Sequence, residues 1–439
     1  MQKKEQQDEK LSRRDFVKAA AAASFAGVSP VLTGKIRAAG SDILKVGLIG
    51  CGGRGTGAAT QALMGVDKSV RLWAMADLFQ DKLDASYNML SKGAKGRYDR
   101  VDFEGLAGQM DVPERRRFVG FDAYQGLIDS GVDMVILATP PHFRPEHFEA
   151  AVKAGKHVFM EKPAAVDPVG IRRVISAAKL AEEKGLSVVA GTQRRHQLHY
   201  IEILKRIHNG AIGEIVAAQC YWNGGGGSLT RKKPEGMSDM EWQCRRWYYF
   251  CWLCGDHIAE QHVHNIDIMN WALQGHPVSA MGVGGRAVRE GGNIWDHFAV
   301  EFEYPGGVRV LSMCRQIPRC TDRVSERIVG TKGFAYIDGS HGFIKGESSY
   351  EGPASPNPYV QEHVDLIQSI RKGAGLNEGV QVAESTMCAI MGRMSAYTGR
   401  ALKWDWAMKA SKLDLSPEKY EFGDLPVRPV AVPGKTMLI

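Results

Sequence analysis

A short apolar segment that runs directly into a cluster of glycines is the feature that most restricts the fold of this chain. Residues 43–49 are rich in Ile, Leu and Val, which predicts a buried β-strand. Gly50-Cys-Gly-Gly-Arg-Gly55 follows at once, and a helical segment begins near Thr56. In such a unit Gly50 permits the tight turn, Gly52 lets the backbone approach a pyrophosphate, and Gly55 lets the helix pack closely on the strand. The pattern therefore predicts a dinucleotide-binding fold, with a glycine turn of purely structural use as the alternative.

A second apolar strand is predicted for residues 70–76, and it ends at Asp77, 22 residues beyond Gly55. A carboxylate at this place can bind the 2′-hydroxyl of a ribose and repels a 2′-phosphate. The neighbouring residues, Leu78 and Phe79, supply no cation that would attract such a phosphate. NAD is therefore favoured over NADP as the cofactor.

Strand and helix signals continue to alternate along the chain, which is typical of a doubly wound parallel sheet in an α/β fold. Further strands are predicted for residues 133–139 and 157–160, with a helix over residues 145–154 between them. Ligands of such sheets bind beyond the carboxyl ends of the strands. The polar residues that follow these strands are therefore candidate ligand contacts.

Together these features resemble the Gfo/Idh/MocA family, which is named for glucose–fructose oxidoreductase and inositol dehydrogenase. The resemblance rests on the glycine motif, on Ala138-Thr-Pro with His147 downstream, and on Glu161-Lys-Pro at a strand end. It covers residues 43–405 and implies a Rossmann domain followed by an α+β domain with a large, open, mostly antiparallel sheet. It also implies that Lys162 reaches both the nicotinamide and a substrate hydroxyl, whereas the alternative is a solvated surface lysine.

The motifs and the resemblance indicate one set of candidate residues for binding NAD. Its members lie in the glycine turn, after the second strand and beyond the ends of the later strands. They are Gly50, Gly52, Gly53, Arg54, Gly55, Asp77, Thr139, Pro140, His142, Glu161, Lys162 and Gln193.

The later part of the chain has the signals of an α+β unit. A helix is predicted for residues 198–208, and strands are predicted for residues 297–304 and 308–316, where apolar and polar side chains alternate. Residues 339–358 are rich in Gly, Ser and Pro and are expected to be loops. In the resembled family the open face of this sheet is commonly used for contacts between subunits, which implies a homo-oligomer, either a dimer or a tetramer.

Glu260 and His264 lie in the segment with the densest set of functional side chains. They are four residues apart, so on one helix they would share a face, with His257 one turn earlier. The resembled family carries an acid here, a histidine four residues later, and then an acid and an aromatic residue. Matched residue by residue, the resemblance implies that His264 corresponds to the family's catalytic histidine and that Glu260 stands where an aspartate is usual. Asp267 and Trp271 complete the pattern.

These residues predict how a proton is handled. Imidazole titrates near neutral pH, so His264 is the preferred general base, while Lys162 stabilises the developing alkoxide and Glu260 orients His264 or holds a hydroxyl. A buried His264 that is merely hydrogen-bonded is the alternative. His257, Glu260 and His264 also have suitable chemistry for a divalent metal ion, but no further pattern supports such a site and no metal is expected.

Aromatic residues crowd the same part of the sequence, and sugars present apolar C–H faces that fit such rings. The candidate substrate-binding residues are Arg194, His196, Trp247, Tyr248, His257 and Asp267. Packing in the protein core explains some of the aromatic residues equally well.

Cys251 and Cys254 form a CxxC without a second pair for zinc, so they are expected to be small buried side chains, with a disulfide as the alternative.

Residues 1–40 have the pattern of a twin-arginine signal peptide. A polar start is followed by Ser12-Arg-Arg-Asp-Phe16, by an Ala-rich run over residues 19–26 and by small residues at 38–40. The apolar run is too short to span a bilayer, so no membrane anchor is expected. This route exports folded proteins, and the mature protein is therefore expected in the periplasm. An ordinary amphipathic helix is the alternative.

The net charge supports this division of the chain. The 439 residues carry 56 Lys and Arg against 49 Asp and Glu, a formal charge of +7. Eight of the basic and four of the acidic residues lie in residues 1–40, which leaves 48 against 45 and a balance of +3. The basic excess is thus mainly that of the leader, and no nucleic-acid partner is expected. The predicted parts are a signal peptide (1–40), a Rossmann domain (41–165), a substrate and oligomerisation domain (166–410) and a C-terminal extension (411–439).

The chain as a whole is predicted to be an exported, NAD-dependent oxidoreductase that acts on a hydroxyl of a sugar, polyol or glycoside, with a 3-keto-glycoside as one class of product. The alternative is an NAD-dependent glycosidase. The related glycoside hydrolase family 109 implies such a route, through transient oxidation at C3, elimination, addition of water and re-reduction. The sequence around His264 departs from the Tyr-x-x-His motif of that group. A cofactor-stabilised binding protein is a third hypothesis, which Lys162 and His264 argue against.

Replacement of both Arg13 and Arg14 by Lys tests the export hypothesis. The export machinery recognises this pair, so the doubly substituted chain should accumulate in the cytoplasm as uncleaved precursor. Cell fractionation followed by immunoblotting measures the distribution. A chain with Lys3→Gln and Lys4→Gln, which changes the leader elsewhere and keeps the arginine pair, is the matched control. Unchanged export of the double-lysine chain contradicts the hypothesis.

Overall fold

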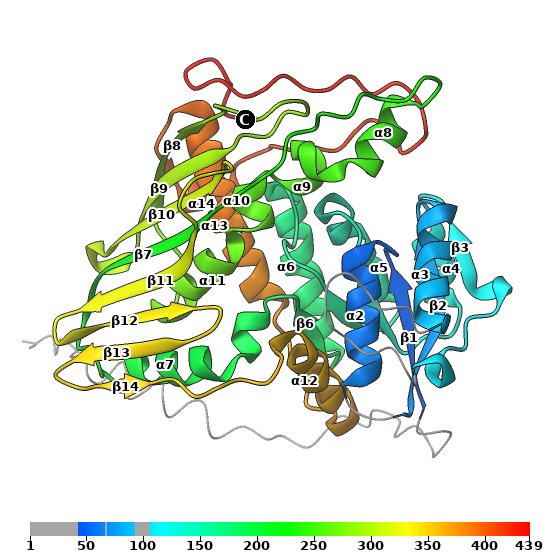
Figure 1. Ribbon diagram of the computed structural model, residues 1–439, viewed down its shortest axis with the longest axis horizontal. Helices are drawn as coiled ribbons and strands as arrows, with labels where there is room; N and C mark the ends of the chain where they lie inside the picture. Colours follow the sequence, from blue (N-terminus) through cyan, green and yellow to red (C-terminus); the bar gives the residue numbers. More distant parts are fainter. Residues whose placement is uncertain (1–42, 66–67, 93–105) are drawn as a thin grey trace, which may run out of the picture. The chain divides into compact units, whose positions relative to one another are not determined.

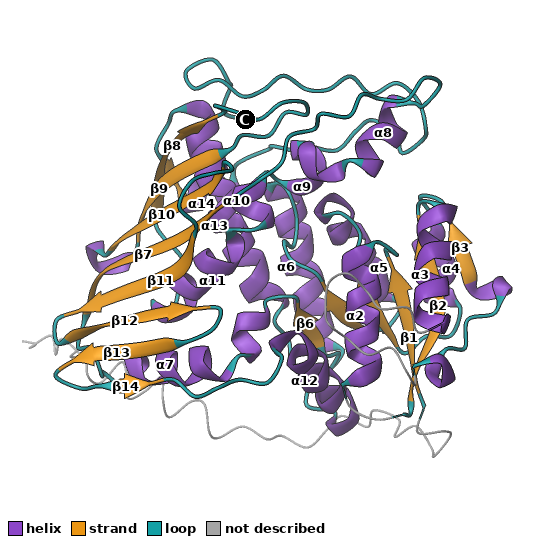
Figure 2. Cartoon of the chain, in the orientation of Figure 1, coloured by secondary structure: helices purple, strands orange, loops and turns teal. Residues whose placement is uncertain are grey.

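Two β-sheets organise the part of the chain that the structure describes, which is residues 43–65, 68–92 and 106–439 of a computed structural model. Figure 1 traces this part along the sequence, and Figure 2 separates its helices from its strands. The predicted signal peptide, with Arg13 and Arg14, lies outside the described residues. None of the described helices has the length and apolar character needed to cross a membrane.

The first sheet is parallel and six-stranded, with the order β3-β2-β1-β4-β5-β6. Its strands are β1 (Leu44–Ile49), β2 (Val70–Asp77), β3 (Arg117–Val119), β4 (Met134–Leu137), β5 (His157–Met160) and β6 (Val188–Ala190). The order changes direction between β1 and β4, which is where ligands bind in such sheets. Strand β6 lies beyond the domain boundary expected at residue 165, because helix α6 (Pro168–Glu183) returns the chain to the edge of the same sheet.

Helices cover both faces of the parallel sheet. One face carries α2 (Gly53–Met64), α3 (Gln80–Lys92) and α12 (Pro358–Lys372), and the other carries α4 (Ala123–Asp129), α5 (Arg144–Lys153) and α6. All four side chains of β4 are buried, and alternate ones enter different hydrophobic clusters, as expected for a strand covered on both faces. Helix α12 comes from late in the chain and packs against α2. The sequence predicted that this helix belongs to the second domain, but it completes the first.

The second sheet is nine-stranded and mostly antiparallel, with the order β14-β13-β12-β11-β7-β10-β9-β8-β15 and one parallel pair, β7 with β10. Its strands are β7 (Ile215–Gly224), β8 (Ser279–Gly285), β9 (His297–Glu303), β10 (Arg309–Gln316), β11 (Arg323–Gly330), β12 (Gly333–Asp338), β13 (Gly342–Gly346), β14 (Tyr350–Glu351) and β15 (Leu402–Lys403). The predicted fold class is therefore confirmed. The expectation that residues 339–358 are loops is wrong, because β13 pairs with β12 and β14 pairs with β13.

Among the described residues, helices pack on one face of this second sheet and none packs on the other. Helices α7 (Leu198–His208), α11 (Val263–Ala272) and α13 (Gly379–Thr398) pack on the covered face, and α13 also contacts α6. Every second side chain of β10 is buried on the covered side. The open face exposes apolar side chains of β8 and β10, namely Met281, Val283 and Leu311. The last helix is α14 (Trp404–Lys409).

After β7 the chain passes through four short helices, α8 (Asp239–Arg245), η5 (Trp247–Tyr249), α9 (Cys251–Cys254) and α10 (His257–Glu260). The expectation that Glu260 and His264 share one helix is wrong, because α10 ends at Glu260 and α11 begins at Val263. Cys251 and Cys254 are buried, and all eight cysteines, each among the described residues, are unpaired. Residues 411–439, the predicted C-terminal extension, contain no helix or strand.

Candidate functional site

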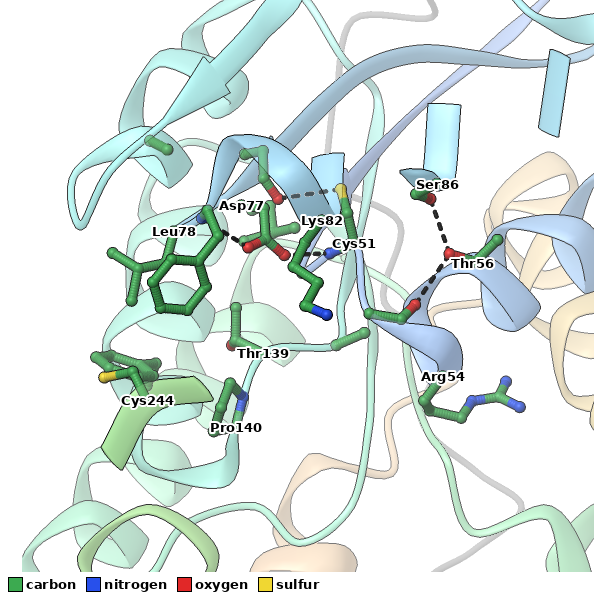
Figure 3. Close-up of a pocket in the computed structure, with 18 of the residues that line it drawn as sticks. Cys51, Arg54, Thr56, Asp77, Leu78, Lys82, Ser86, Thr139, Pro140 and Cys244 are labelled. Carbon is green, nitrogen blue, oxygen red and sulfur yellow. Dashed lines mark hydrogen bonds between the residues drawn. The ribbon is translucent and has the colours of Figure 1, made fainter. Parts of the chain in front are cut away.

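A cavity of about 490 Å³ lies at the carboxyl ends of β1, β2 and β4 (Figure 3). The glycine turn, the acid and the Thr-Pro pair follow three different strands, and the parallel sheet brings those strand ends together. The lining of the cavity includes seven of the predicted cofactor residues, which are Gly50, Gly52, Gly53, Arg54, Asp77, Thr139 and Pro140.

The three motif glycines differ in what a side chain would meet. Gly50 has φ +99°, and a Cβ there would lie 2.6 Å from the backbone of Ala138. A Cβ at Gly55 would lie 1.8 Å from the carbonyl oxygen of Gly50, so α2 approaches β1 more closely than any side chain permits. At Gly52 no atom of the described residues lies within 4 Å of such a Cβ. Its backbone faces open space, as a close approach of a pyrophosphate requires.

Asp77 ends β2, and both of its carboxylate oxygens accept backbone hydrogen bonds. Oδ2 accepts from the N–H of Cys51 at 2.6 Å, and Oδ1 accepts from the N–H of Phe79 at 2.8 Å. Burial raises the pKa of Asp77, although these two N–H groups favour the ionised form. Lys82 of α3 lines the same cavity beside Asp77, as Figure 3 shows. Lys82 lies five residues after Asp77 in the sequence, and no motif predicts that it lines the cavity.

His142 lies outside the cavity lining, although it was predicted as a cofactor contact. Its Nε2 atom lies 2.8 Å from the hydroxyl oxygen of Tyr420, and its ring meets the indole of Trp252 edge-on. Burial lowers the pKa of His142 to about 4, so the imidazole is neutral at pH 7. The turn that follows β4 thus places His142 against the C-terminal extension.

Arg54 and Glu161 connect the cavity to a second group of side chains. Nε of Arg54, near the start of α2, donates to Oε1 of Glu161 at 2.6 Å. Glu161 directly precedes Lys162, so this ion pair holds the loop after β5 beside the glycine turn. Gln193 also lies outside the lining, and its Nε2 atom donates to the hydroxyl of Tyr359 at 3.3 Å.

Lys162 and Glu260 form the centre of this second group. Nζ of Lys162 donates to Oε1 of Glu260 at 3.0 Å and also to the backbone carbonyl oxygen of Glu260. The two side chains are 14% and 13% exposed, so the pair is largely shielded from water. Oε2 of Glu260 is buried without a hydrogen-bond partner in the described part of the chain. Glu260 therefore contacts Lys162 through one carboxylate oxygen, and the other is left without a hydrogen-bond partner in that part of the chain.

His264 is 6% exposed, and its ring lies against the indole of Trp222, with 5.6 Å between the ring centres. Burial lowers the pKa of His264 well below 6.5, and the positive charges of Lys162 and Arg194 lower it further. Nδ1 is buried and has no hydrogen-bond partner among the described residues. A neutral imidazole with such a nitrogen can accept a proton, as a general base must.

Three further residues that the sequence did not single out, Gln261, Gln316 and Tyr359, border this group. Nε2 of Gln316 donates to Oε1 of Gln261 at 2.8 Å and to the hydroxyl of Tyr248. Burial raises the pKa of Tyr248 well above 10, and the nearby charge of Glu260 raises it further. Gln316 ends a predicted strand, which is the one signal that could have indicated it. Tyr359 begins α12, far along the chain, and has no local signal.

Four of the predicted substrate contacts are engaged inside the protein. Arg194 pairs with Glu326, His196 bridges Asp365 and Glu378, His257 binds Asp256, and Asp267 accepts two hydrogen bonds from Arg195. All four are buried, and a buried charge is stable only with a partner. Of the remaining two, Trp247 lines the dinucleotide cavity, and Tyr248 lies beside Gln316.

Asp256 holds the start of α10 in a strained conformation. Its backbone has φ 66° and ψ 162°, a region that only glycine adopts readily, and its side chain is fully buried. The carboxylate accepts hydrogen bonds from the N–H and Nδ1 of His257, from the N–H of Trp295 and from the hydroxyl of Tyr397. These contacts offset a strain of about 1–3 kcal/mol and fix the helix that carries Glu260.

Within the described ranges, no group of three His, Cys, Asp or Glu side chains is placed to hold a metal ion. His257 is bound to Asp256, and Glu260 is bound to Lys162, so the geometry does not support the alternative metal site. The neighbouring His262 lies 2.7 Å from the hydroxyl of Ser312 through Nε2, and burial lowers its pKa to about 3. His262 is therefore a neutral residue of the core.

Comparison with known protein families decides the assignment. The oxidoreductase family with an NAD-binding Rossmann fold, Gfo/Idh/MocA, matches residues 44–192, and the Gfo/Idh/MocA C-terminal domain matches residues 200–336. The two matches together cover nearly two thirds of the chain. The chain belongs to the Gfo/Idh/MocA family. Its cofactor is NAD, and the predicted resemblance is confirmed.

Individual curated relatives of the chain are similar to it at low sequence identity. The 2,7-anhydro-N-acetylneuraminate hydratase of Escherichia coli (strain K12) is 26% identical over 218 residues, which are 48% of this chain and 51% of the hydratase. The chain spans about half the length, or less, of the first curated relatives it matches.

Solved structures show the shared fold over a longer range. The aldose-aldose oxidoreductase of Caulobacter crescentus, complexed with glycerol, has a TM-score of 0.63 and 20% identity, over 82% of this chain and 99% of that one. The scyllo-inositol dehydrogenase of Lactobacillus casei, with bound NAD(H) and scyllo-inositol, has a TM-score of 0.60 and 17% identity over 82% and 99%. At these identities the likeness extends to the Gfo/Idh/MocA fold alone.

Alanine at Gly55 and at Gly52 should separate folding from NAD binding in this family member. Because a Cβ at Gly55 overlaps the backbone, Gly55→Ala is expected to lower the free energy of unfolding by about 1–3 kcal/mol or more. Gly52→Ala meets open space, so unfolding should be unchanged while the affinity for NAD falls about tenfold or more. Thermal unfolding and a fluorescence titration with NAD measure the two effects. Equal loss of stability in both variants would contradict these roles.

His196→Gln tests whether His196 is an ion-pair partner and not a substrate contact. Burial lowers the pKa of His196, but Asp365 and Glu378 outweigh this effect and raise the pKa to about 10. The folded pKa thus exceeds the unfolded value of about 6.5, so the stabilisation is complete below that pH and is lost as the pH rises towards 10. The difference in melting temperature between wild type and variant should shrink from about pH 7 to pH 10. An unchanged melting temperature with a raised KM would indicate a substrate contact instead.

Proposed function

We propose that this protein oxidises a carbinol carbon of an uncharged sugar, polyol or glycoside, with NAD as the hydride acceptor. The observation that carries the proposal is the Lys162–Glu260 pair beside a neutral His264, on a loop that Arg54 joins to the NAD cavity. A cation, a proton acceptor and a dinucleotide site are the groups that oxidation of an alcohol requires.

Each residue of the group has a separate task. When bound, NAD supplies the ring carbon that takes up the hydride. Lys162 donates two hydrogen bonds to Glu260, and the third N–H of its ammonium group stabilises the negative charge on the substrate oxygen. His264 takes the hydroxyl proton, and the charge of Lys162 favours the neutral imidazole that this step needs. Oε2 of Glu260 accepts a hydrogen bond from a neighbouring hydroxyl.

The charges around the group support an uncharged substrate. Arg194 is paired with Glu326, and Arg289 donates to Oε1 of Gln316 and to two backbone carbonyl oxygens. Neither cation is left to pair with a carboxylate or phosphate of a substrate. The ring of Trp222 fits the apolar face of a sugar. The side-chain amides of Gln261 and Gln316 fit its hydroxyls. The names of the two structural relatives, which concern aldoses and scyllo-inositol, agree with this class.

The proposal includes the periplasm as the place of action. What supports it is the pattern of residues 1–40, with the pair Arg13 and Arg14 before an Ala-rich run. The double-lysine chain described above tests this part independently of the enzymatic activity.

A glycosidase that oxidises and re-reduces its own substrate is the second candidate. One relative is named as a hydratase, and hydration involves no net oxidation. In this route transient oxidation acidifies the neighbouring C–H bond, a leaving group is eliminated, water adds, and the carbonyl group is reduced again. Lys162 and His264 serve the oxidation in both routes. Release of an aglycone without added NAD would favour the glycosidase, and formation of a keto sugar without such release would favour the oxidoreductase.

Substitution of the two proposed catalytic residues tests the function. Lys162→Ala and His264→Ala should each lower kcat/KM by about 100-fold or more, because each removes the stabilisation of the alkoxide or the acceptor of the proton. Binding of NAD should persist, since neither side chain lines the cavity. The measurement follows NADH absorbance and aglycone release over a panel of polyols, aldoses and aryl glycosides.

The matched control for this experiment is His208→Ala, at the exposed end of α7. It removes the same type of side chain as His264→Ala, far from Lys162 in the sequence and outside the group of site residues. Its rates should equal those of the wild type. Wild-type rates in the Lys162→Ala or His264→Ala variant would refute the proposed roles.

A further inference from the structure

A row of hydrogen bonds runs from a buried arginine to the residue next to Glu260. It begins at Arg289, in the turn between β8 and β9, and continues to Gln316 at the end of β10. From there it divides, to Tyr248 in η5 and to Gln261. Strand β10 packs beside α10, the helix that ends at Glu260 (Figure 1). The row therefore connects the buried charge of Arg289 to the edge of the site.

The guanidinium of Arg289 is buried, and each of its three nitrogens donates a hydrogen bond. Nε donates to the carbonyl oxygen of Trp295 at 3.0 Å, Nη1 donates to that of Gly227 at 2.8 Å, and Nη2 donates to Oε1 of Gln316. Oδ2 of Asp296 accepts the backbone N–H of Arg289 at 3.0 Å and so holds the turn. Because a guanidinium presents its donors in a rigid, planar fork, these acceptors fix its position.

The chemistry of arginine determines which way the amide of Gln316 faces. A guanidinium can only donate, so the atom of Gln316 beside Arg289 must be the oxygen. The amide nitrogen then faces the other way, where Nε2 donates to Oε1 of Gln261 at 2.8 Å and to the hydroxyl oxygen of Tyr248 at 2.5 Å. Both hydrogens of that nitrogen are used. A flipped amide would place its nitrogen against the cation, so the direction of the row cannot reverse.

The two residues that accept these hydrogen bonds keep their own donors, and we call Tyr248 and Gln261 the donor pair. Oε1 of Gln261 is engaged, and no described residue accepts a hydrogen bond from its Nε2 atom. The hydroxyl proton of Tyr248 likewise has no acceptor among the described side chains. Burial raises the pKa of Tyr248 well above 10, and the charge of Glu260 raises it further, so this proton stays in place. Both side chains are partly exposed, and a small molecule can reach them.

The neighbouring side chains of the site present acceptors instead. Oε2 of Glu260 and Nδ1 of His264 have no hydrogen-bond partner in the part of the chain that the structure describes. A substrate hydroxyl can donate to such atoms. The site thus has an acceptor side and a donor side, which suit different oxygen atoms of a substrate.

A donor side with a fixed direction distinguishes one kind of oxygen. A hydroxyl both donates and accepts, so it can turn to suit donors or acceptors. The ether oxygen of a sugar ring or of a glycosidic bond can only accept, so it loses its hydrogen bond when it is bound against an acceptor. A donor pair that cannot reverse is therefore required only by an oxygen that carries no hydrogen.

We propose that Tyr248 and Gln261 bind an ether oxygen of the substrate, and that Arg289 is the positioning residue that keeps both of them as donors. The proposal rests on the function proposed above and narrows its substrate. A pyranose or glycoside, which has such oxygens, is bound in preference to an inositol or an open-chain polyol, which has hydroxyls alone. The donor pair determines which molecule binds, while Lys162 and His264 act on the carbinol carbon.

Gln316→Glu reverses the row without removing it. The carboxylate pairs with Arg289, and its second oxygen accepts hydrogen bonds from Tyr248 and from Gln261, whose amide then turns its oxygen to the substrate. The variant should bind the preferred methyl pyranoside about tenfold more weakly or worse, and its preference over myo-inositol should disappear. Calorimetric titration of the protein saturated with NADH, in which no oxidation takes place, measures binding. NADH absorbance in a separate assay with NAD measures kcat/KM.

The titrations use the methyl pyranosides of glucose, galactose and mannose, followed by two analogues of the one that binds most tightly. In the carba analogue a methylene group replaces the ring oxygen, and the anhydroalditol lacks the oxygen at the anomeric carbon. Wild-type protein should bind one of the two analogues about tenfold more weakly than the parent, which identifies the ether oxygen that is bound. This difference should disappear in the Gln316→Glu variant, and Tyr248→Phe, which removes one donor, should reduce it.

Gln274→Glu, at an exposed residue after α11, is the matched control. It introduces the same charge away from the row and should bind as the wild type does. Thermal unfolding shows that each variant is folded, and Tyr248→Phe decides the question if the Gln316→Glu chain does not fold.

Equal binding of the parent and both analogues by the wild type overturns the donor pair, as does an unchanged difference in a folded variant. Tighter binding of myo-inositol than of every pyranoside overturns it as well. If Lys162-dependent oxidation of a polyol persists in these cases, the proposed function stands. A pyranoside that binds with the expected difference but is not oxidised contradicts the function alone. Wild-type protein that binds none of the three pyranosides overturns the donor pair.

Discussion

The buried ion pair between Lys162 and Glu260 is the contact on which the arrangement of the site depends. Lys162 follows β5 of the parallel sheet, and Glu260 ends a one-turn helix from the second half of the chain, so the pair joins two parts that are far apart in sequence. Two charges withdrawn from water are stable only when paired in good geometry. The ion pair of Arg54 with Glu161 fixes the backbone on the lysine side, and the strained turn at Asp256 fixes it on the glutamate side.

The same rule explains why so many charged residues near the site do not face it. Arg194 is buried against Glu326, which also accepts hydrogen bonds from Tyr200 and Asn265. This network leaves no open charge for a ligand, yet Arg194 still lowers the pKa of His264. A cation held in place by a partner can thus keep the imidazole neutral without contacting the substrate. The scaffold behind the site therefore sets its electrostatics as well as its shape.

The parallel domain follows from local signals, because each motif lies within a few residues of the strand end that positions it. Asp77 and Lys162 could be predicted in this way, and so could the glycine turn. The partners of the buried charges could not, since the type of a residue does not reveal what it meets in the folded chain. The break between Glu260 and His264 has no proline or glycine, and it depends on tertiary contacts such as that of His262 with Ser312. Spacing alone therefore predicted one helix where there are two.

The C-terminal extension lies outside both segments that match the Gfo/Idh/MocA family, and its contacts are on the side of the cofactor. It packs behind Phe79 and Phe121, two rings that line the cavity, and leaves the group around Lys162 to elements inside the matched segments. A family that keeps its catalytic side chains on strand ends and on short helices can vary such an extension without disturbing them.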